Sequence, residues 1–532
     1  MKGFFMNTKY LLIFVLVVVS LVSGCARVDN TTFRWAIPEE PATLDSRQSQ
    51  GTAESYVLYQ LFEGLTTENA KGDVVPGVAS SWEIDDNGSH YVFHLRDSKW
   101  SNGDPVTAYD FEYTWLKTLS PEFGSHSAEM LYFIKNAEAY NSGKVNADLV
   151  GIKAIDAHTL DVRLQAPAPF FLNLVGYNTK YLPVNKKVAE ANPHWMERPE
   201  SLVSNGAFVL QSWDHGSKML FSANDNYWNK SAVKLKAVSC VFVDNAQTDL
   251  SMFESGQLDM SEAGFPATSS DKLIQENKLK FYPSLALTYI GVNSKTKPFD
   301  DARVRKALAL AIDRNALVSA NKNSGRKPAY GLVPYGIIDS ATGKDFRVEG
   351  GALFDENVSL AKRLLSEAGF PDGNGFPASA ILYSTDSASK QTCEIIQDMW
   401  KRNLGIAVTL TNCEWKVYLQ QMQSGNFSIT RGGWSGDYID PLTFLNLFVS
   451  TDGNNRVRYN NARYDKLVRV ALATGDQSIR MRDLHAAEKV IMDDMGVIPI
   501  YFSSTSALVA SNVSGVIRDA TGSVLLREAQ KN

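Results

Sequence analysis

Apolar and polar positions in the first part of the chain alternate over short runs. Between Tyr91 and Arg96 the bulkiest apolar side chains fall on every second position, and this period of two predicts a half-buried strand. Further strands are expected over 33–37 and 159–165. Helices are expected over 55–65 and from a Thr107 cap through Trp115. Strands and helices mix here without a regular βαβ repeat.

The second half of the chain follows a helical period instead. Apolar residues recur on one face of 302–317, where Asp300 or Asp301 can cap the helix. Two further helices are expected over 358–368, ended by Gly369, and over 393–403, ended near Gly405, with a strand over 406–410 after them. This succession of helices and strands predicts an α/β lobe.

The N-terminus has the pattern of an export signal. Lys2 and Lys9 precede an apolar run from Tyr10 to Val19, and small residues lead to Cys25. The run is shorter than the roughly 20 residues that span a bilayer. We therefore expect residues 1–24 to be removed rather than to remain as a membrane helix.

Length and charge narrow the class of protein. Removal of 1–24 would leave 508 residues, too many for one core, so two or three lobes are expected. The chain carries a formal charge of −5, and the signal holds two lysines and no acids, so the remaining chain carries −7. Mild acidity without a basic block argues against nucleic acid or anionic lipid as the main partner.

Cysteine usage argues against a cysteine-based metal site. Apart from Cys25 the chain holds Cys240, Cys393 and Cys413, and no Cys-x-x-Cys pair occurs. Three cysteines permit at most one disulfide and a free thiol, and we favour three small buried side chains. No metal and no cofactor are expected.

The most informative stretch runs from Arg431 to Pro441, R-G-G-W-S-G-D-Y-I-D-P. It places a fixed cation, Arg431, and an anion, Asp437, at the two ends of a segment rich in glycine. A short zwitterion with a main chain between its charges, such as a peptide, has the matching pattern.

Several stretches resemble the oligopeptide-binding proteins, the family 5 extracytoplasmic solute receptors of peptide ABC importers. The segment from Val78 to Phe111, with W-S-N-G-D-P-V-T-A-Y-D-F at its end, is similar to the long family signature. The Leu-x-Ser-Gly-Cys end of the signal resembles a bacterial lipobox, which implies lipidation of Cys25. The other matching stretches are 204–208, 224–228, 255–260, 302–314 and the 431–441 segment itself.

The resemblance implies a bilobal class II (cluster C) periplasmic-binding-protein fold of α/β type with an additional domain in the N-terminal half. Its segments would be lobe I from 27–62, 187–288 and 505–532, an extra domain II from 63–186, and lobe III from 289–504. The lobes would open and close about strands near residues 288 and 504.

The resemblance also implies roles for individual residues. Asp437 would hold the α-ammonium of a peptide, and Arg431 would meet its C-terminal carboxylate. Main-chain groups of Gly433 and Ser435 would pair with the ligand, which would lie as an added strand. The remaining implied contacts are Trp434 and Trp415 in side-chain pockets, and Gln50 and Thr52 on the opposite side.

The implied protein is a monomeric, non-enzymatic receptor at the outer face of a bacterial membrane, with short peptides and the permease of an importer as partners. Two departures from the family pattern bear on ligand length. Met422 replaces a second arginine nine residues before Arg431, and 261–266 lacks the expected tyrosine and asparagines.

Other readings remain open at this point. The same fold could serve a specialised ligand, such as a signalling or cell-wall peptide, a nickel complex, haem or an oligosaccharide. A secreted hydrolase is disfavoured, because the sequence lacks Gly-x-Ser-x-Gly, His-Glu-x-x-His and Gly-Lys-Ser/Thr motifs. A passive adhesin or chaperone would not need a charged pair in a closed cleft.

Overall fold

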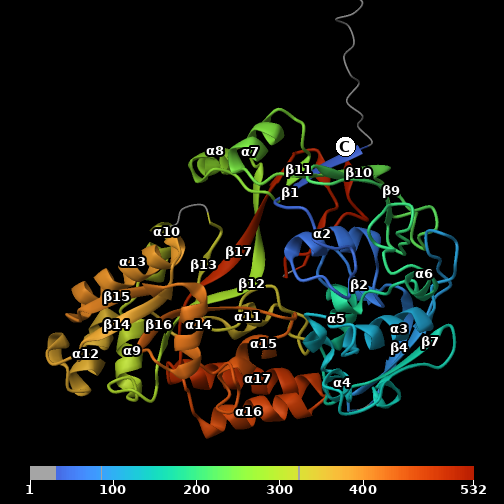
Figure 1. Cartoon of the computed structure of the whole chain (residues 1–532). Helices are drawn as coiled ribbons and strands as arrows, with labels where there is room; N and C mark the ends of the chain where they lie inside the picture. Colours follow the sequence, from blue (N-terminus) through green and yellow to red (C-terminus); the bar gives the residue numbers. More distant parts are fainter. Residues whose placement is uncertain (1–31, 86, 321–323, 520) are drawn as a thin grey trace, which may run out of the picture.

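A large mixed sheet runs through the molecule (Figure 1). The computed structural model describes residues 32–85, 87–320, 324–519 and 521–532. The predicted signal and Cys25 lie outside these residues. The sheet has 11 strands in the order β15-β14-β16-β12-β17-β11-β1-β10-β9-β8, with β13 paired to β17. Its strands are β1 (Thr32–Ile37), β8 (Phe208–Asp214), β9 (Lys218–Ala223), β10 (Ala237–Phe242), β11 (Met260–Ser261), β12 (Leu279–Val292), β13 (Lys327–Pro328), β14 (Ser379–Ser384), β15 (Val408–Cys413), β16 (Ile429–Ser435) and β17 (Ile498–Val509).

Two long antiparallel strands, β12 and β17, join the two halves of this sheet (Figure 1). One end of the pair adjoins β11 and β1, and the other end adjoins β16 and β14. Their register shifts between Pro283 and Leu287, and again between Thr288 and Tyr289. The ladder is therefore irregular where the chain passes from one half to the other.

The half that holds β14–β16 has its own apolar core. Trp400 of α13 is fully buried in it, and its indole N–H donates to the Leu308 carbonyl oxygen over 2.9 Å. The helices around this part are α9 (Ala302–Leu310), α10 (Arg314–Ala320), α12 (Val358–Glu367), α13 (Ser387–Leu404) and α14 (Trp415–Ser424). The prediction for α12 is confirmed, and α13 begins six residues before its predicted start.

The prediction of a single helix over 302–317 is wrong. Asp301 caps α9 by accepting from the Arg303 N–H, as expected, but the helix ends at Leu310 and α10 begins at Arg314. The buried Arg314 guanidinium explains the break, because it donates to main-chain carbonyls of Ala309, Ile312 and Pro499. The apolar period of a sequence does not show that a buried arginine will bind main-chain carbonyls at the end of a helix.

A second sheet lies in the N-terminal half, in the order β4-β5-β7-β6. Its strand β5 buries every second residue, which confirms the predicted alternation. Helix α3 begins at a capping box in which Asp110 accepts from the Thr107 N–H. The strands are β4 (Ala79–Ile84), β5 (His90–Leu95), β6 (Ile152–Ala154) and β7 (Thr159–Arg163), and α3 spans Ala108–Leu119.

Helix α2 (Thr52–Leu61) begins three residues before its predicted start and ends earlier than predicted. The Glu54 carboxylate accepts from the Gly51 and Ala42 N–H groups, and this contact fixes the turn before the helix. The other helices are α4 (Ala137–Asn141), α5 (Phe171–Tyr177), α6 (Lys186–Ala191), α7 (Ala246–Glu254), α8 (Ser270–Gln275), α11 (Phe346–Gly350), α15 (Leu442–Leu445), α16 (Ala462–Ala473) and α17 (Gln477–Asp493).

The cysteines behave largely as predicted. Cys240 and Cys393 are buried free thiols, and Cys413 is a half-buried free thiol. Burial raises the pKa of Cys393 to about 12. Within the described part of the chain, no helix is both long enough and apolar enough to cross a membrane, and no three metal-binding side chains gather.

Candidate ligand-binding site

Strand β16 presents an edge that no other strand covers along most of its length. On one side it pairs with β12, with Gly433 opposite Thr288. On the other side β14 pairs only with Ile429 and Thr430. From Arg431 to Ser435 this outer edge therefore meets no strand among the described residues, and a ligand strand can be added there.

The orientation of the main chain follows from two hydrogen bonds. The Tyr418 hydroxyl donates to the Arg431 carbonyl oxygen over 2.8 Å, from the side away from β12. The Gly436 N–H donates to Leu285 of β12 over 2.6 Å. Because successive residues of a strand point their main-chain groups to opposite sides, Gly433 and Ser435 face outward with Arg431.

Gly432 lets β16 lie close to an aromatic ring. A Cβ atom built at Gly432 would lie 2.5 Å from Tyr289 Cε2, within the van der Waals radius of the ring. At Gly433 the nearest atom to such a Cβ would be the Leu287 carbonyl oxygen, at 3.3 Å. The first glycine is thus required by packing, and the second leaves space on the exposed part of the strand.

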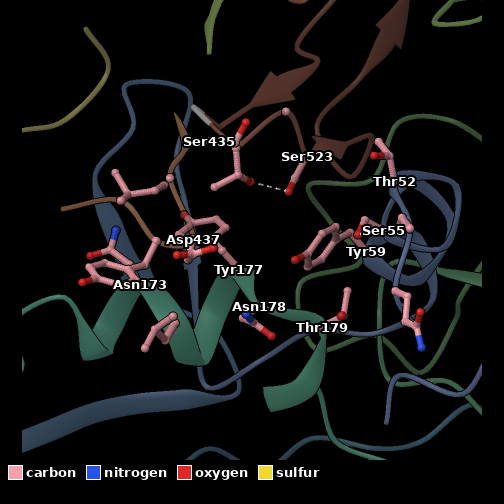
Figure 2. Close-up of a pocket in the computed structure, with 18 residues that line it drawn as sticks. Thr52, Ser55, Tyr59, Asn173, Tyr177, Asn178, Thr179, Ser435, Asp437 and Ser523 are labelled. Carbon is pink, nitrogen blue, oxygen red and sulfur yellow. Dashed lines mark hydrogen bonds between the residues drawn. The ribbon is translucent and has the colours of Figure 1, made fainter. Parts of the chain in front are cut away.

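A cavity of about 450 Å³ lies between α2, α5 and the segment after β16 (Figure 2). Asp437 lies on one side of it and Thr52, Ser55 and Tyr59 lie on the other. Most of its lining residues have a polar side chain. The lining residues are Gln50, Gly51, Thr52, Ser55, Tyr59, Asn173, Leu174, Tyr177, Asn178, Thr179, Ser435, Gly436, Asp437, Tyr438, Ile439, Thr521, Gly522 and Ser523.

A second cavity of about 520 Å³ follows the free edge of β16 and has more apolar walls. It shares Ser435 and Asp437 with the first cavity, so the two spaces adjoin. Its lining residues are Ala286, Leu287, Thr288, Tyr289, Ser384, Trp415, Tyr418, Leu419, Met422, Arg431, Gly432, Gly433, Trp434, Ser435, Asp437, Leu447, Asn454, Arg456 and Ser503.

Asp437 stands at the junction of the two cavities. Its main-chain N–H donates to the Thr443 hydroxyl over 3.0 Å. The loop after it is fixed by the Asp440 carboxylate, which accepts hydrogen bonds from both terminal N–H groups of Arg480, over 2.9 and 2.7 Å. Partial removal of water raises the pKa of Asp437, and the negative charge of Glu129 adds to this effect. A cation placed beside this carboxylate would relieve both effects.

Arg431 reaches into the second cavity with few partners. Its guanidinium donates to the Thr288 and Tyr501 hydroxyls, both over 3.4 Å, and its buried Nε has no partner. Burial acts to raise the pKa of Tyr501, but the positive charges of Arg431 and Arg326 and the hydrogen bond with Thr288 together lower it. Among the described residues Arg431 forms no ion pair, although its positive charge is one of the groups that hold the pKa of Asp386 below its usual range.

All eight residues expected to contact a ligand line these two cavities. Four of them, Gln50, Thr52, Ser435 and Asp437, line the first. The second is lined by Trp415, Arg431, Gly433, Trp434, Ser435 and Asp437. The indole of Trp415 is 55% exposed and stacks on Tyr418 with ring centroids 5.5 Å apart.

Sequence reasoning missed the polar wall of the first cavity. Asn173 and Asn178 lie on and after α5, and Ser523 comes from near the C-terminus. An apolar segment rich in phenylalanine, Ala166–Phe171, directly precedes these asparagines, and nothing in the sequence indicates that they face a cleft. Their role depends on contacts between distant segments.

The two departures from the family pattern occupy different places. Met422 is largely buried beside Leu382 and Tyr418 and lines the second cavity, so an apolar group stands where an arginine was expected. The 261–266 segment lines neither cavity. Instead its Glu262 forms an ion pair with Arg518.

The site is a cleft between two halves of one sheet, and it has a free strand edge and groups of opposite charge. These features define a two-lobed ligand-binding protein. The chain belongs to the bacterial extracellular solute-binding proteins, family 5, whose model (described as family 5 Middle) matches residues 73–456. The oligopeptide-binding protein OppA of Bacillus subtilis is 37% identical over 510 residues, which cover 94% of this chain and 92% of that protein.

Solved structures agree with this assignment and confirm the expected class II binding-protein fold. The unliganded open form of the murein tripeptide-binding protein MppA, known from Escherichia coli, has a TM-score of 0.86 and 33% identity, with 95% of this chain and 98% of that chain covered. Haemophilus influenzae OppA in complex with the peptide RPPGFSPFR has a TM-score of 0.68 and 31% identity, with 94% and 99% covered. The present structure is thus more similar to the open form than to this peptide complex.

Proposed function

We propose that this protein is the extracytoplasmic receptor of a peptide ABC importer, and that it binds short peptides as an extended strand between its lobes. One observation carries the proposal. The free edge of β16 connects a carboxylate, Asp437, at the junction of two cavities to the guanidinium of Arg431 in the second cavity, which has only long contacts to two hydroxyls among the described residues. The printed names of the relatives, which include oligopeptide- and dipeptide-binding proteins, support the same ligand class.

The outward main-chain groups of Gly433 and Ser435 would pair with the ligand backbone. Main-chain groups that lose water without a partner cost about 1–3 kcal/mol each, so a ligand strand needs these contacts. Gln50 and Thr52 would contact the ligand from the other wall of the first cavity. Side chains of the ligand would point away from this ladder, and binding would depend little on peptide sequence.

The charged groups would fix the ends of the peptide. Asp437 would hold the α-ammonium, which has a pKa near 8 and is mostly charged at neutral pH. Arg431 would hold the C-terminal carboxylate, since a guanidinium fork matches a carboxylate. Trp415 and Trp434 would line the pockets for side chains between these two ends.

The domains would follow the sheet. Lobe I would comprise 27–62, 187–288 and 505–532, domain II would comprise 63–186, and lobe III would comprise 289–504. Closure would occur about β12 and β17, whose register is irregular near Leu287. A ligand would favour the closed state, because only that state allows contacts from both walls.

The anchor and the partner complete the proposal. Cys25 would be lipidated after removal of 1–24 and would hold a monomer at the outer face of the membrane. More than one acyl chain is needed for a stable hold, because one chain binds only marginally. The closed, loaded receptor would then dock on the permease and release its peptide.

Native mass spectrometry of the protein as purified tests the ligand class. We expect a series of adducts with the masses of short peptides, which would also give their lengths. A single adduct of another mass, or an empty protein whose melting temperature does not rise with a peptide mixture, would overturn the proposal. At 100 times the dissociation constant a ligand adds about 2.7 kcal/mol to stability, which a melting curve detects.

A further inference from the structure

The second cavity contains two arginines, and one of them lies outside the 431–441 segment. Arg456 lies in the loop between Val449 and Asn461 and lines the cavity together with Arg431. Both guanidiniums act on the phenol of Tyr289, where burial raises the pKa and the two positive charges oppose the rise. The cavity is therefore bordered by two cations near one tyrosine.

Neither of these arginines forms an ion pair among the residues that the structure describes, although the charge of Arg431 helps to lower the pKa of Asp386. Arg456 donates to the side-chain oxygen of Asn454 over 3.3 Å, and Arg431 donates to two hydroxyls. Most other buried arginines in the described part of the chain form ion pairs, whereas Arg305 donates to main-chain carbonyls. Examples of these ion pairs are Arg47 with Asp45 at 2.8 Å, Arg347 with Glu488 at 2.5 Å and Arg480 with Asp440 at 2.7 Å.

The loop that carries Arg456 is firmly held on both sides of it. Asn455 is 3% exposed, and its side-chain amide donates to the carbonyls of Phe448, Val449 and Tyr459. Val457 is fully buried, and its carbonyl accepts from the Ser294 N–H. Two buried neighbours fix the main chain, so the half-exposed side chain of Arg456 is held at the cavity without an ion pair of its own.

The charges in the cavity are unequal. Asp437 lies at the junction and lines both cavities. Arg431 and Arg456 line the second cavity and not the first. The C-terminal carboxylate of a peptide brings one negative charge. Closure over such a peptide would leave the second guanidinium without a counter-charge in a site with little water, which is unfavourable.

We propose that Arg456 is a specificity-determining residue that binds an acidic side chain of the ligand, so that the receptor prefers peptides with an Asp or Glu in addition to the terminal carboxylate. This inference rests on the proposed peptide-binding function. The apolar walls of the cavity, formed by Leu287, Leu419 and Leu447, would strengthen the attraction, because they keep water away from the ion pair.

Isothermal titration on the full-length protein in detergent tests the preference. The ligands are alanine-based tri- to pentapeptides with one Glu or, as a neutral isostere, one Gln at each position in turn. We expect one position at which Glu binds about tenfold to a hundredfold more tightly than Gln. Arg456→Gln should remove this difference and raise the affinity for the Gln peptides, because closure then leaves no guanidinium without a counter-charge. Arg456→Lys should restore part of it.

The matched control is Arg469→Gln, which removes an exposed arginine of α16 that lines neither cavity, and which should keep the Glu preference. If peptides bind but Glu and Gln are equivalent at every position, the inference about Arg456 is wrong and the proposed function stands. If the Glu preference survives in Arg456→Gln, another residue causes it and the inference is also wrong. If no peptide binds, the proposed function itself fails.

Discussion

The Tyr418 hydroxyl donates to the Arg431 carbonyl oxygen over 2.8 Å and thereby occupies the first outward main-chain acceptor of the free β16 edge. Further along the same edge, no strand in the described part of the chain pairs with Gly433 or Ser435 on that side. We expect Tyr418→Phe to extend the edge that a ligand can use by one acceptor. Affinity for longer peptides should then rise relative to shorter ones, as measured by titration with a length series.

The hydroxyl also supports the fold, and Tyr418→Phe should lower stability by about 1 kcal/mol. Tyr132→Phe is a suitable control, because it removes a tyrosine hydrogen bond, to Asn141, from a residue that lines neither cavity. It should lower stability without any change in the length profile. An unchanged profile in Tyr418→Phe would show that Arg431 does not form the end of the ligand ladder.

Strand addition predicts that ligand N–H groups matter at every second position. Methylation of a ligand nitrogen removes one donor, and an N–H···O bond contributes about 0.5–1.5 kcal/mol. Single N-methylation along a tetrapeptide should weaken binding at alternate residues and have little effect at the others. A uniform loss at all positions, or none at any, would contradict binding along the edge at Gly433 and Ser435.

Asp437→Asn should weaken peptides with a free amine and should hardly affect their N-acetylated forms. The reason is that the amide keeps the shape of the side chain but loses the charge that attracts an ammonium. Competition binding with paired free and acetylated peptides measures the difference. Equal losses for the two forms would remove the assigned role of Asp437.

The raised pKa of Asp437 gives this contact a pH dependence. As pH falls through that pKa the carboxyl becomes neutral, so affinity for free-amine peptides should fall at a higher pH than an ordinary aspartate would give. Affinity should also fall above about pH 8, where the α-amino group loses its proton. The stability of the empty protein depends on pH in the opposite direction. The folded state binds the proton more tightly than the unfolded state, so the charge reduces stability as pH rises through the folded pKa, and Asp437→Asn should melt slightly higher above it.

Arg431→Gln should reduce affinity for short peptides about tenfold and abolish the distinction between C-terminal acids and amides. The buried Nε has no partner to lose, and the two hydroxyl contacts are long, so thermal stability should change little. Titration with matched acid and amide tripeptides checks this result. A distinction that persists in the variant would place the carboxylate elsewhere.

Gly432→Ala should destabilise the fold by about 1–3 kcal/mol, because its Cβ would meet the Tyr289 ring. Gly453→Ala provides a control of the same chemical change, since a Cβ there would have no neighbour within 4 Å. Denaturant unfolding of both variants measures the contrast. Equal stability would indicate that β16 can move away from Tyr289 at little cost.

The sequence predicted element types better than their ends. The alternation in β5 and the helix over 358–368 with its glycine stop depend on local sequence, and both were confirmed. The break between α9 and α10 depends on Arg314, whose guanidinium binds the Pro499 carbonyl 185 residues away. Such a contact is set by tertiary packing and leaves no periodic trace in the local sequence.

The sequence predicted the part of the candidate site in which several cavity-lining residues lie in one short segment. Arg431, Gly433 and Asp437 are close in sequence and line one continuous cleft. Arg456 was not found from the sequence, because its neighbours Asn455 and Val457 give no hint that the residue between them faces a cavity. An arginine in a polar loop has the same local appearance whether it faces a cavity or bulk solvent.

The position of Asp437 at the meeting point of the two cavities bears on stoichiometry. Two separate spaces of this size could in principle hold two small molecules at once. A ligand whose affinity depends on its amino group, however, needs the single carboxylate that both spaces share. Two such peptides therefore exclude each other, and mixtures should saturate the protein at one molecule per chain whatever their lengths.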